Sequence, residues 1–429
     1  MIQTIRKAWA IPELRKKILF TAMMMLIFRI GNAIPVPYVD TRVLGTYLDQ
    51  MSTTVLGLWN AMSGGAFAAA TIFALGVQPY INSSIIIQLL TIAFPNSLGR
   101  WAREGGEEGK KKIQNITRYA TVAIAILQGV GYFFLMKNNM GILTSESVWA
   151  AIVIVVSFVA GSCFVMWMGE QITEFGIGNG ISMILFAGIL SRIPTAVTTM
   201  YGSLVAGTMK WWMVLLVLVG VLALVVLIVF VNNAERRIPV QYAKRQVGRK
   251  MYGGQSSTLP MKVNMSGVLP IIFAQSIAMI PSTIAAFFKA PKEGTFWHGF
   301  LEFIDTKSFM YMLVYFVLII GFSYFYSTIQ FNPVEIANNL KKNGGFIPGV
   351  RPGKPTADFI KKVLNKVTLF GAVYLGVVAI LPLVLGMIIE NPGLSIGGTS
   401  VIIVVGVALE TVQALESQML MRQYKGFLE

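Results

Sequence analysis

The strongest constraint on this chain is a series of long apolar runs separated by polar connections. Ten runs are long enough to cross a lipid bilayer, which requires about 20 apolar residues per helix. They span about 18–36, 70–94, 117–136, 148–168, 181–200, 211–232, 267–288, 308–328, 367–389 and 397–417. Because lipid offers the backbone no hydrogen-bond partners, such runs fold as helices. We therefore expect an all-α membrane protein with ten transmembrane helices.

Composition narrows the possible functions. Hydrophobic residues make up 55% of the 429-residue chain and charged residues only 13%. The single cysteine, Cys163, excludes an internal disulfide, and the single histidine, His298, is a poor basis for a metal site or a hydrolase triad. No Walker lysine, HExxH or GxSxG pattern is present. The sequence thus predicts neither an enzyme nor a metal or cofactor site.

Basic residues orient the chain in the membrane. Five of them precede the first run, which places the N-terminus in the cytoplasm by the positive-inside rule, and an even number of spans returns the C-terminus there. The connections at about 233–266 and 329–366 each carry seven Lys or Arg residues, more than orientation requires. Two interpretations remain open: contact with anionic lipid, or a docking surface for an acidic or RNA-rich cytoplasmic partner.

A short internal repeat divides the chain. The pattern Gly-Val-x-Pro-x-Ile begins at Gly76 in the second span and at Gly267 in the seventh. It suggests two halves of five spans, 1–205 and 206–429, and because five is odd the halves have opposite orientations. Inverted repeats with helices interrupted by Gly or Pro usually bracket a central pathway.

Branched apolar residues recur at helical spacing in four of these spans. They are Ile81, Ile85, Ile181, Leu185, Ile272 and Ile403. Periodicity alone makes them ordinary core residues. If the four spans surround a cavity, the same side chains form an apolar constriction that excludes water and ions.

Three classes of membrane protein fit this pattern: a channel, a secondary transporter and a scaffold without a pore. Coupled transporters usually bury an acid near the bilayer centre. Glu410, about two-thirds through the last span, is the nearest candidate. Packing is the alternative role for Glu410.

Nine stretches in order carry a resemblance to a known family. They are "FRIGNAIPVP", "SGGAF", "IFALGVQPYINSSIIIQLL", "TRYAT", "GIGNGIS", "ERRIPVQYAKR", "LPMKVNMSGVLPIIFAQS", "FNPVEIANNLKKNGGFIPGVRPGKPT" and "GGTSVIIVV". Over nearly its whole length the chain resembles the SecY/Sec61-alpha family of protein-conducting channels. The resemblance implies an hourglass channel that passes unfolded secretory polypeptides and releases membrane helices into the bilayer.

The resemblance also implies roles for individual residues. The six branched apolar residues named above would form a pore ring. A movable plug, about 57–68, would include Trp59, Ala61, Ser63, Gly64, Gly65, Ala66 and Phe67, and we expect its glycines to act as a loose hinge. A lateral gate between spans 2–3 and 7–8, through which signal sequences and membrane helices leave for lipid, would carry Ser84, Gln88, Gln128 and Gln275.

Partners follow from the same resemblance. The two basic loops would dock SecA or the ribosome through Arg236, Arg237, Lys244, Arg245, Arg351 and Lys354. SecE and SecG would complete the complex in a bacterial plasma membrane, preproteins with signal sequences would be the cargo, and anionic lipid would surround it.

Overall fold

The computed structural model describes residues 2–50, 59–60, 62–94, 97–138, 142–145, 147–207, 210–242, 245–247, 250–252, 256–265, 267–287, 299–300, 308–389 and 398–425. These residues are mostly helical. The N-terminal half contains α1 (Ile2–Ala10), α2 (Pro12–Gly31), α3 (Thr41–Gln50), α5 (Gln78–Ala93), α6 (Leu98–Glu104), α7 (Gly106–Asn138), α8 (Val148–Phe175), α9 (Gly180–Leu190) and α10 (Ile193–Val205). The C-terminal half contains α11 (Trp211–Asn233), α12 (Leu269–Phe287), α14 (Phe309–Gln330), α15 (Pro333–Lys342), α16 (Lys354–Ile389) and α17 (Gly398–Lys425).

The predicted helical membrane fold is confirmed. Each of the ten predicted runs contains a helix. Seven stretches of the described chain are long and apolar enough to cross a bilayer: Gly106–Asn138, Val148–Phe175, Gly180–Val205, Trp211–Asn233, Phe309–Lys342, Lys354–Leu381 and Ser400–Leu420. The helix α5 falls short because it has only 16 residues. In α2, charged residues interrupt the apolar sequence at both ends.

The second span begins later than the sequence predicted. A helix was expected from about residue 70, but the chain runs through turns as far as Val77 and α5 begins at Gln78. Gly76 has φ +53°, a left-handed conformation that stops a helix from extending further back. Pro79 then occupies the first turn of α5, where a missing N–H leaves no bond unmade.

The seventh span starts in the same way. Gly267 has φ +63°, α12 begins two residues later, and Pro270 is its second residue. The repeated Gly-Val-x-Pro pattern therefore codes the same local start in both helices.

The fifth span is also broken. It was predicted as one run over 181–200, but α9 ends at Leu190 and α10 begins at Ile193. Pro194 lies in the first turn of α10 and cannot donate a backbone bond to the preceding turn. The stretch "GIGNGIS" turns into α9: the Asn179 side chain caps the helix by accepting from the N–H groups of Ile181 and Ser182, at 3.0 and 3.3 Å.

Strands were not predicted, and they are the main departure from an all-α chain. The antiparallel strands β1 (Glu235–Tyr242) and β4 (Ser256–Lys262) form a hairpin after α11, and β2 (Arg245–Val247) pairs with β3 (Lys250–Tyr252). The strand β5 (Gly345–Phe346) pairs with the free edge of β1, so β4, β1 and β5 form a three-stranded sheet, while β2 and β3 form a separate two-stranded sheet. The three-stranded sheet thus joins the two basic connections, 233–266 and 329–366, into one unit with its own small core around Ile238, Met261 and Ile360.

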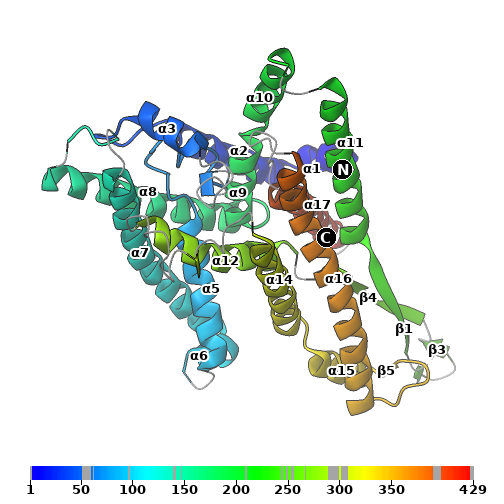
Figure 1. Ribbon diagram of the computed structural model, residues 1–429. Coiled ribbons are helices and arrows are strands. Elements are labelled where there is room, and N and C mark those ends of the chain that lie inside the picture. Colours follow the sequence, from blue (N-terminus) through cyan, green and yellow to red (C-terminus); the bar gives the residue numbers. More distant parts are fainter. Residues whose placement is uncertain are drawn as a thin grey trace.

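The arrangement of elements separates two ends of the molecule. In Figure 1, α6, α15 and the strands lie toward the lower end of the view, and α3 and α10 lie toward the upper end. The largest hydrophobic cluster draws on α2, α5, α8, α9, α12, α14, α16 and α17. A second cluster packs α7 and α8 against residues 59–75. Helix α12 packs against α5 and α7 of the other half.

Candidate functional site

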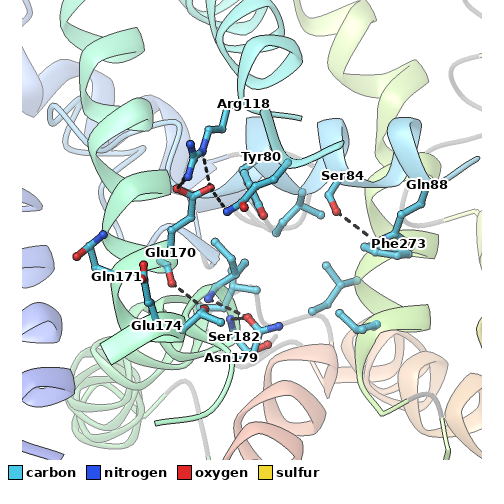
Figure 2. Close-up of a pocket in the computed structure, with 18 of the residues that line it drawn as sticks. Tyr80, Ser84, Gln88, Arg118, Glu170, Gln171, Glu174, Asn179, Ser182 and Phe273 are labelled. Atoms are coloured by element: carbon cyan, nitrogen blue, oxygen red, sulfur yellow. Dashed lines mark hydrogen bonds and ion pairs between the residues drawn. The ribbon is translucent and has the colours of Figure 1, made fainter. Parts of the chain in front are cut away.

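A cavity of about 750 Å³ opens between the two halves of the chain. Its wall is polar on one side, where α5, α7 and α8 contribute Tyr80, Ser84, Gln114, Asn115, Arg118, Glu170 and Glu174. Figure 2 shows Tyr80, Ser84, Arg118, Glu170 and Glu174 around the cavity, with Phe273 of α12 next to Gln88. The cavity is therefore bounded by helices from both halves.

Four of the six predicted ring residues line the cavity. Ile81, Ile181, Leu185 and Ile272 line its apolar part. Ile85 and Ile403 belong to the same hydrophobic cluster as these residues, and Ile403 is only 1% exposed. Side chains from α5, α9, α12 and α17 thus belong to one hydrophobic cluster, and four of the six predicted residues line the cavity.

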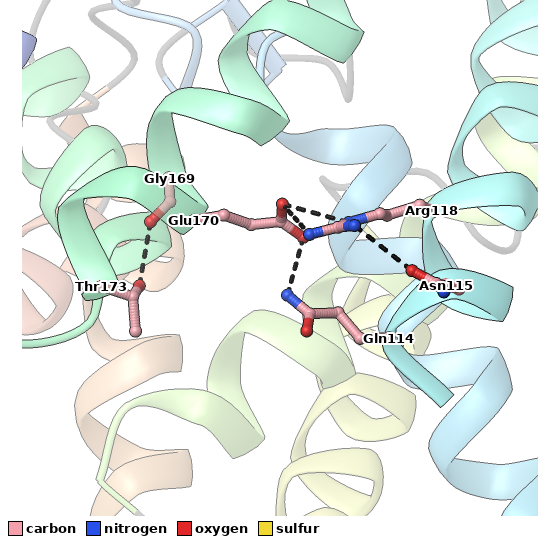
Figure 3. Close-up of polar contacts among 6 residues, drawn as sticks. All are labelled: Gln114, Asn115, Arg118, Gly169, Glu170 and Thr173. Carbon is pink, nitrogen blue, oxygen red and sulfur yellow. Dashed lines mark hydrogen bonds and ion pairs between the residues drawn. The ribbon is translucent and has the colours of Figure 1, made fainter. Parts of the chain in front are cut away.

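The polar wall is organised by an ion pair between α7 and α8. The Arg118 guanidinium binds Glu170 through two nitrogens, with Nη2 donating to Oε2 at 2.7 Å and Nε donating to Oε1 at 2.9 Å. Gln114 Nε2 also donates to Glu170 Oε1, at 3.1 Å (Figure 3). A forked pair of this kind fixes both side chains. It holds the third and fourth spans together at the cavity mouth.

A hydrogen bond crosses the predicted gate. Tyr326 Oη on α14 donates to Gln88 Oε1 on α5 at 2.7 Å, and Gln88 Nε2 donates to Ser84 Oγ at 3.4 Å. Gln128 on α7 and Gln275 on α12 are buried, and within the described chain their Oε1 atoms accept no hydrogen bond. Buried acceptors without partners are costly to keep, by about 1–3 kcal/mol each. The four predicted residues thus lie along the contact of α5 and α7 with α12 and α14.

The plug segment, residues 57–68, is described at 59–60 and 62–68; Ala61 and residues 57–58 lie outside the described chain. Helix continues only as far as Met62, and turns follow. Ser63 Oγ donates to the Asn60 carbonyl and accepts from the Phe67 N–H, both at 3.1 Å. Asn60 Oδ1 accepts from the Ala68 N–H at 2.9 Å. These hydrogen bonds hold residues 60 and 62–68 in a compact turn.

The described part of the segment is closely packed. Trp59 is 3% exposed, Phe67 is 1% exposed and their rings stack at 5.2 Å, while Ala66 is also buried. Gly64 and Gly65 adopt φ +70° and +90°, so they set a fixed turn. Gly64 also lies against the backbone of Gly188 on α9. Close packing, rather than small size alone, holds the segment in place.

Gly64→Ala is expected to loosen the segment. A β-carbon there would stand 2.9 Å from the Gly188 carbonyl oxygen, and the left-handed backbone adds about 1–2 kcal/mol. Amide hydrogen exchange at Phe67 and Ala69 should accelerate at least tenfold. Gly65→Ala is the matched control, because it shares the left-handed backbone but meets open space. Equal acceleration in both variants would contradict the role of the Gly64–Gly188 contact.

The predicted docking residues gather on the sheet and the turn beside it. Arg236 and Arg237 lie on β1, where Arg237 Nε donates to Glu235 Oε1 at 2.6 Å, and Arg245 belongs to β2. Lys244 lies outside the described residues. Arg351 is exposed in the turn before α16, Lys354 begins that helix, and Thr356 Oγ1 donates to the Arg351 carbonyl at 2.8 Å. Pairing of β5 with β1 joins the two groups through one sheet.

Three contacts escaped sequence reasoning: Tyr326 with Gln88, Arg118 with Glu170, and the hydrogen bond that Tyr132 Oη on α7 donates to the Phe67 carbonyl. Tyr326 and Tyr132 have no distinguishing pattern among the aromatic residues of apolar runs. Arg118 and Glu170 did carry a signal, because a charge within or at the end of a membrane span needs a partner. Pairing the charges at matching depth in the third and fourth spans would have found them.

Comparison with known proteins agrees with this architecture. The SecY family model matches residues 71–412. The protein translocase subunit SecY of Streptomyces coelicolor is 43% identical over 442 residues, with 100% of both chains covered. Among solved structures, a SecY studied for its plug domain and closed state gives a TM-score of 0.68 at 17% identity, and Sec61 in a canine ribosome–channel complex gives 0.63 at 15%. Each covers 97% of both chains. Sequence match over the whole length and the shared fold lead to one conclusion: this chain belongs to the SecY family.

Proposed function

We propose that this chain forms a protein-conducting channel that passes unfolded secretory polypeptides across a membrane and releases membrane helices into it. One observation carries the proposal: a cavity of about 750 Å³ between the halves is lined by polar side chains and by the apolar side chains of Ile81, Ile181, Leu185 and Ile272. The cavity would receive the polypeptide and the apolar side chains would be the constriction it crosses.

The chemistry of the constriction suits an unspecific cargo. Ring residues Ile81, Ile85, Ile181, Leu185, Ile272 and Ile403 offer neither fixed charge nor hydrogen bonds, so no side chain of the cargo is held there. A narrow apolar passage also expels water, which blocks ions while no polypeptide fills it. Aliphatic side chains can change rotamer and make room for the cargo.

The remaining parts would act as seal and exit. The plug segment would close the channel beyond the ring. The halves 1–205 and 206–429 would separate along the contact of α5 and α7 with α12 and α14, where Gln88 and Tyr326 are hydrogen-bonded. The Gly-Pro starts of α5 and α12 would let these two helices tilt. A signal sequence would insert between them.

Energy for transport would come from partners, because the sequence lacks a nucleotide-binding motif. We propose SecA and the ribosome as the motors, docked on the sheet and on the turn of Arg351, with SecE and SecG completing the complex. The structurally similar Sec61 was solved in a ribosome–channel complex. The basic surface would lie in the cytoplasm with both termini, in a bacterial plasma membrane containing anionic lipid.

A secondary transporter is the alternative function, and in it Glu410 would be the buried acid that couples transport. A β-carbon on Gly267 would stand 2.4 Å from Glu410 Oε1, so this carboxylate packs against the start of α12. That contact favours a packing role.

The experiment uses the complex in proteoliposomes with SecA, ATP and a preprotein. Wild type and Glu410→Gln are both expected to protect the preprotein from external protease, within about twofold of each other. Failure of the wild-type complex to protect any preprotein would overturn the proposed function. Loss of small-solute transport in Glu410→Gln, with preprotein export unaffected and the complex intact, would favour the secondary transporter.

A further inference from the structure

A stack of four aromatic rings ties the plug segment to the third and fourth spans. Trp59 stacks on Phe67 at 5.2 Å between centroids, Phe67 stacks on Tyr132 of α7 at 4.2 Å, and Tyr132 packs on Phe158 of α8 at 5.0 Å. Tyr132 is fully buried, and its Oη donates a hydrogen bond to the Phe67 carbonyl. One side chain therefore holds the same plug residue by its ring and by its backbone.

The hydrogen bond from Tyr132 comes from a different part of the chain than the other hydrogen bonds to the plug segment. Asn60 and Ser63 bond within the plug segment. Asn32 Nδ2 donates to the Ser63 carbonyl at 3.3 Å, from the chain just after α2. Those bonds can persist while the segment moves together with its neighbours. Tyr132 instead belongs to α7, a helix that packs directly against α12 of the other half.

The gate helix contributes to the same packing. Met279 of α12 is 3% exposed and belongs to one hydrophobic cluster with Trp59, Phe67, Tyr132 and Phe158. Cores are packed closely, so a shift of one member is transmitted to the others. Movement of α12 away from α7 would withdraw Met279 from the cluster that contains Phe67 and Tyr132.

We propose that Tyr132 is a latch that sets how often the plug segment leaves its closed position, and that movement of α12 releases it. Tyr132 touches the plug segment and acts on the channel through it, so it is a positioning residue. The proposal rests on the proposed channel function. It adds a specific contact of the closed state. The strength of this contact determines how much the idle channel leaks ions and how strictly it rejects preproteins with defective signal sequences.

The test is Tyr132→Phe in the assembled complex in proteoliposomes. This variant keeps the ring stack and removes the hydroxyl, and the Phe67 carbonyl still accepts from the Ala70 N–H at 3.1 Å. We expect ion leak through the idle complex to rise about three- to tenfold, the factor that one net hydrogen bond represents. Export of a preprotein with a defective signal should rise, while export of the normal preprotein stays within twofold. Tyr119→Phe on the same helix, where the side chain is 76% exposed, is the matched control and should change neither.

A second variant and a second readout separate the possible outcomes. Tyr132→Leu also removes the stack and should leak more than Tyr132→Phe. Amide exchange at Phe67 and Ala69 should accelerate in both variants. A merely structural role would instead lower the export of the normal preprotein together with the yield of the complex.

The reference for this experiment is Ile403→Asn, which changes the ring and leaves the latch intact. If Ile403→Asn leaks but both Tyr132 variants behave as wild type, the latch is wrong and the channel stands. If no variant leaks, Ile403→Asn included, the failure lies with the proposed channel function.

Discussion

Ile403→Asn is expected to raise the ion leak of the idle complex at least tenfold and to let preproteins with defective signals through. Ile403 is 1% exposed, on α17, and belongs to the hydrophobic cluster that contains the cavity-lining Ile81, Leu185 and Ile272. Burying an amide there without partners costs about 1–3 kcal/mol, and hydration of the cluster relieves that cost. A hydrated constriction no longer excludes ions. The measurement is conductance of the complex in planar bilayers together with an export assay.

Two controls isolate the effect of polarity at this place. Ile403→Leu keeps an apolar side chain of the same volume and should leave leak at the wild-type level. Leu216→Asn puts the same amide on α11, where the native side chain is 52% exposed, and should not open the pathway. Leak at the wild-type level in Ile403→Asn, in a complex that still assembles, would show that Ile403 does not line the constriction.

Arg351→Glu is expected to lower SecA-driven export at least tenfold without loss of the assembled complex. Arg351 is exposed in a turn whose form is set by Gly349 and Gly353, with φ +82° and +100°, and its side chain is not needed for that turn. Reversing a charge at a complementary interface places like charges together, which costs several kcal/mol. A tenfold loss corresponds to about 1.4 kcal/mol. SecA binding should weaken in parallel with export.

Lys210→Glu is the matched control for this charge reversal. Lys210 is exposed in the connection between α10 and α11, which the proposed topology puts on the opposite side of the membrane. The same change of net charge there should leave export within twofold of wild type. If Arg351→Glu instead prevents recovery of the complex with SecE and SecG, the residue has a structural role and the docking assignment is wrong.

The sequence predicted most of the fold because lipid imposes strong rules. Each of the ten runs contains a helix, and hydropathy was sufficient for that result. The errors lie where local backbone chemistry outweighs hydropathy. Gly76 and Pro79 delay the second helix, and Pro194 divides the fifth. The β1–β4 hairpin was missed because each strand contains a proline, Pro239 or Pro260, which argues against a strand. Packing with Ile360 of α16 gives its apolar residues Ile238, Val240 and Met261 an interior.

The candidate site was predictable only in part. Resemblance supplied the ring, and the structure brings Ile81, Ile181, Leu185 and Ile272 together at the cavity. The sequence predicted a plug at about 57–68 with a loose hinge, but it did not predict how closely residues 59–60 and 62–68 pack. In three dimensions Gly64 permits close backbone contact with Gly188. Pairs such as Tyr132–Phe67 and Tyr326–Gln88 join residues 65 and 238 positions apart, which no local pattern encodes.

Site-specific crosslinking tests most directly whether a polypeptide passes through the apolar ring. A photoreactive residue would replace Ile81, Ile272 or Ile403 in turn, and a preprotein would be stalled in mid-export with SecA and ATP. Leu216 on α11 provides the exposed reference position. The channel function predicts strong crosslinks from all three buried positions to the stalled chain and none from position 216. If the stalled preprotein has crossed the membrane but none of the three buried positions crosslinks to it, the channel function is contradicted.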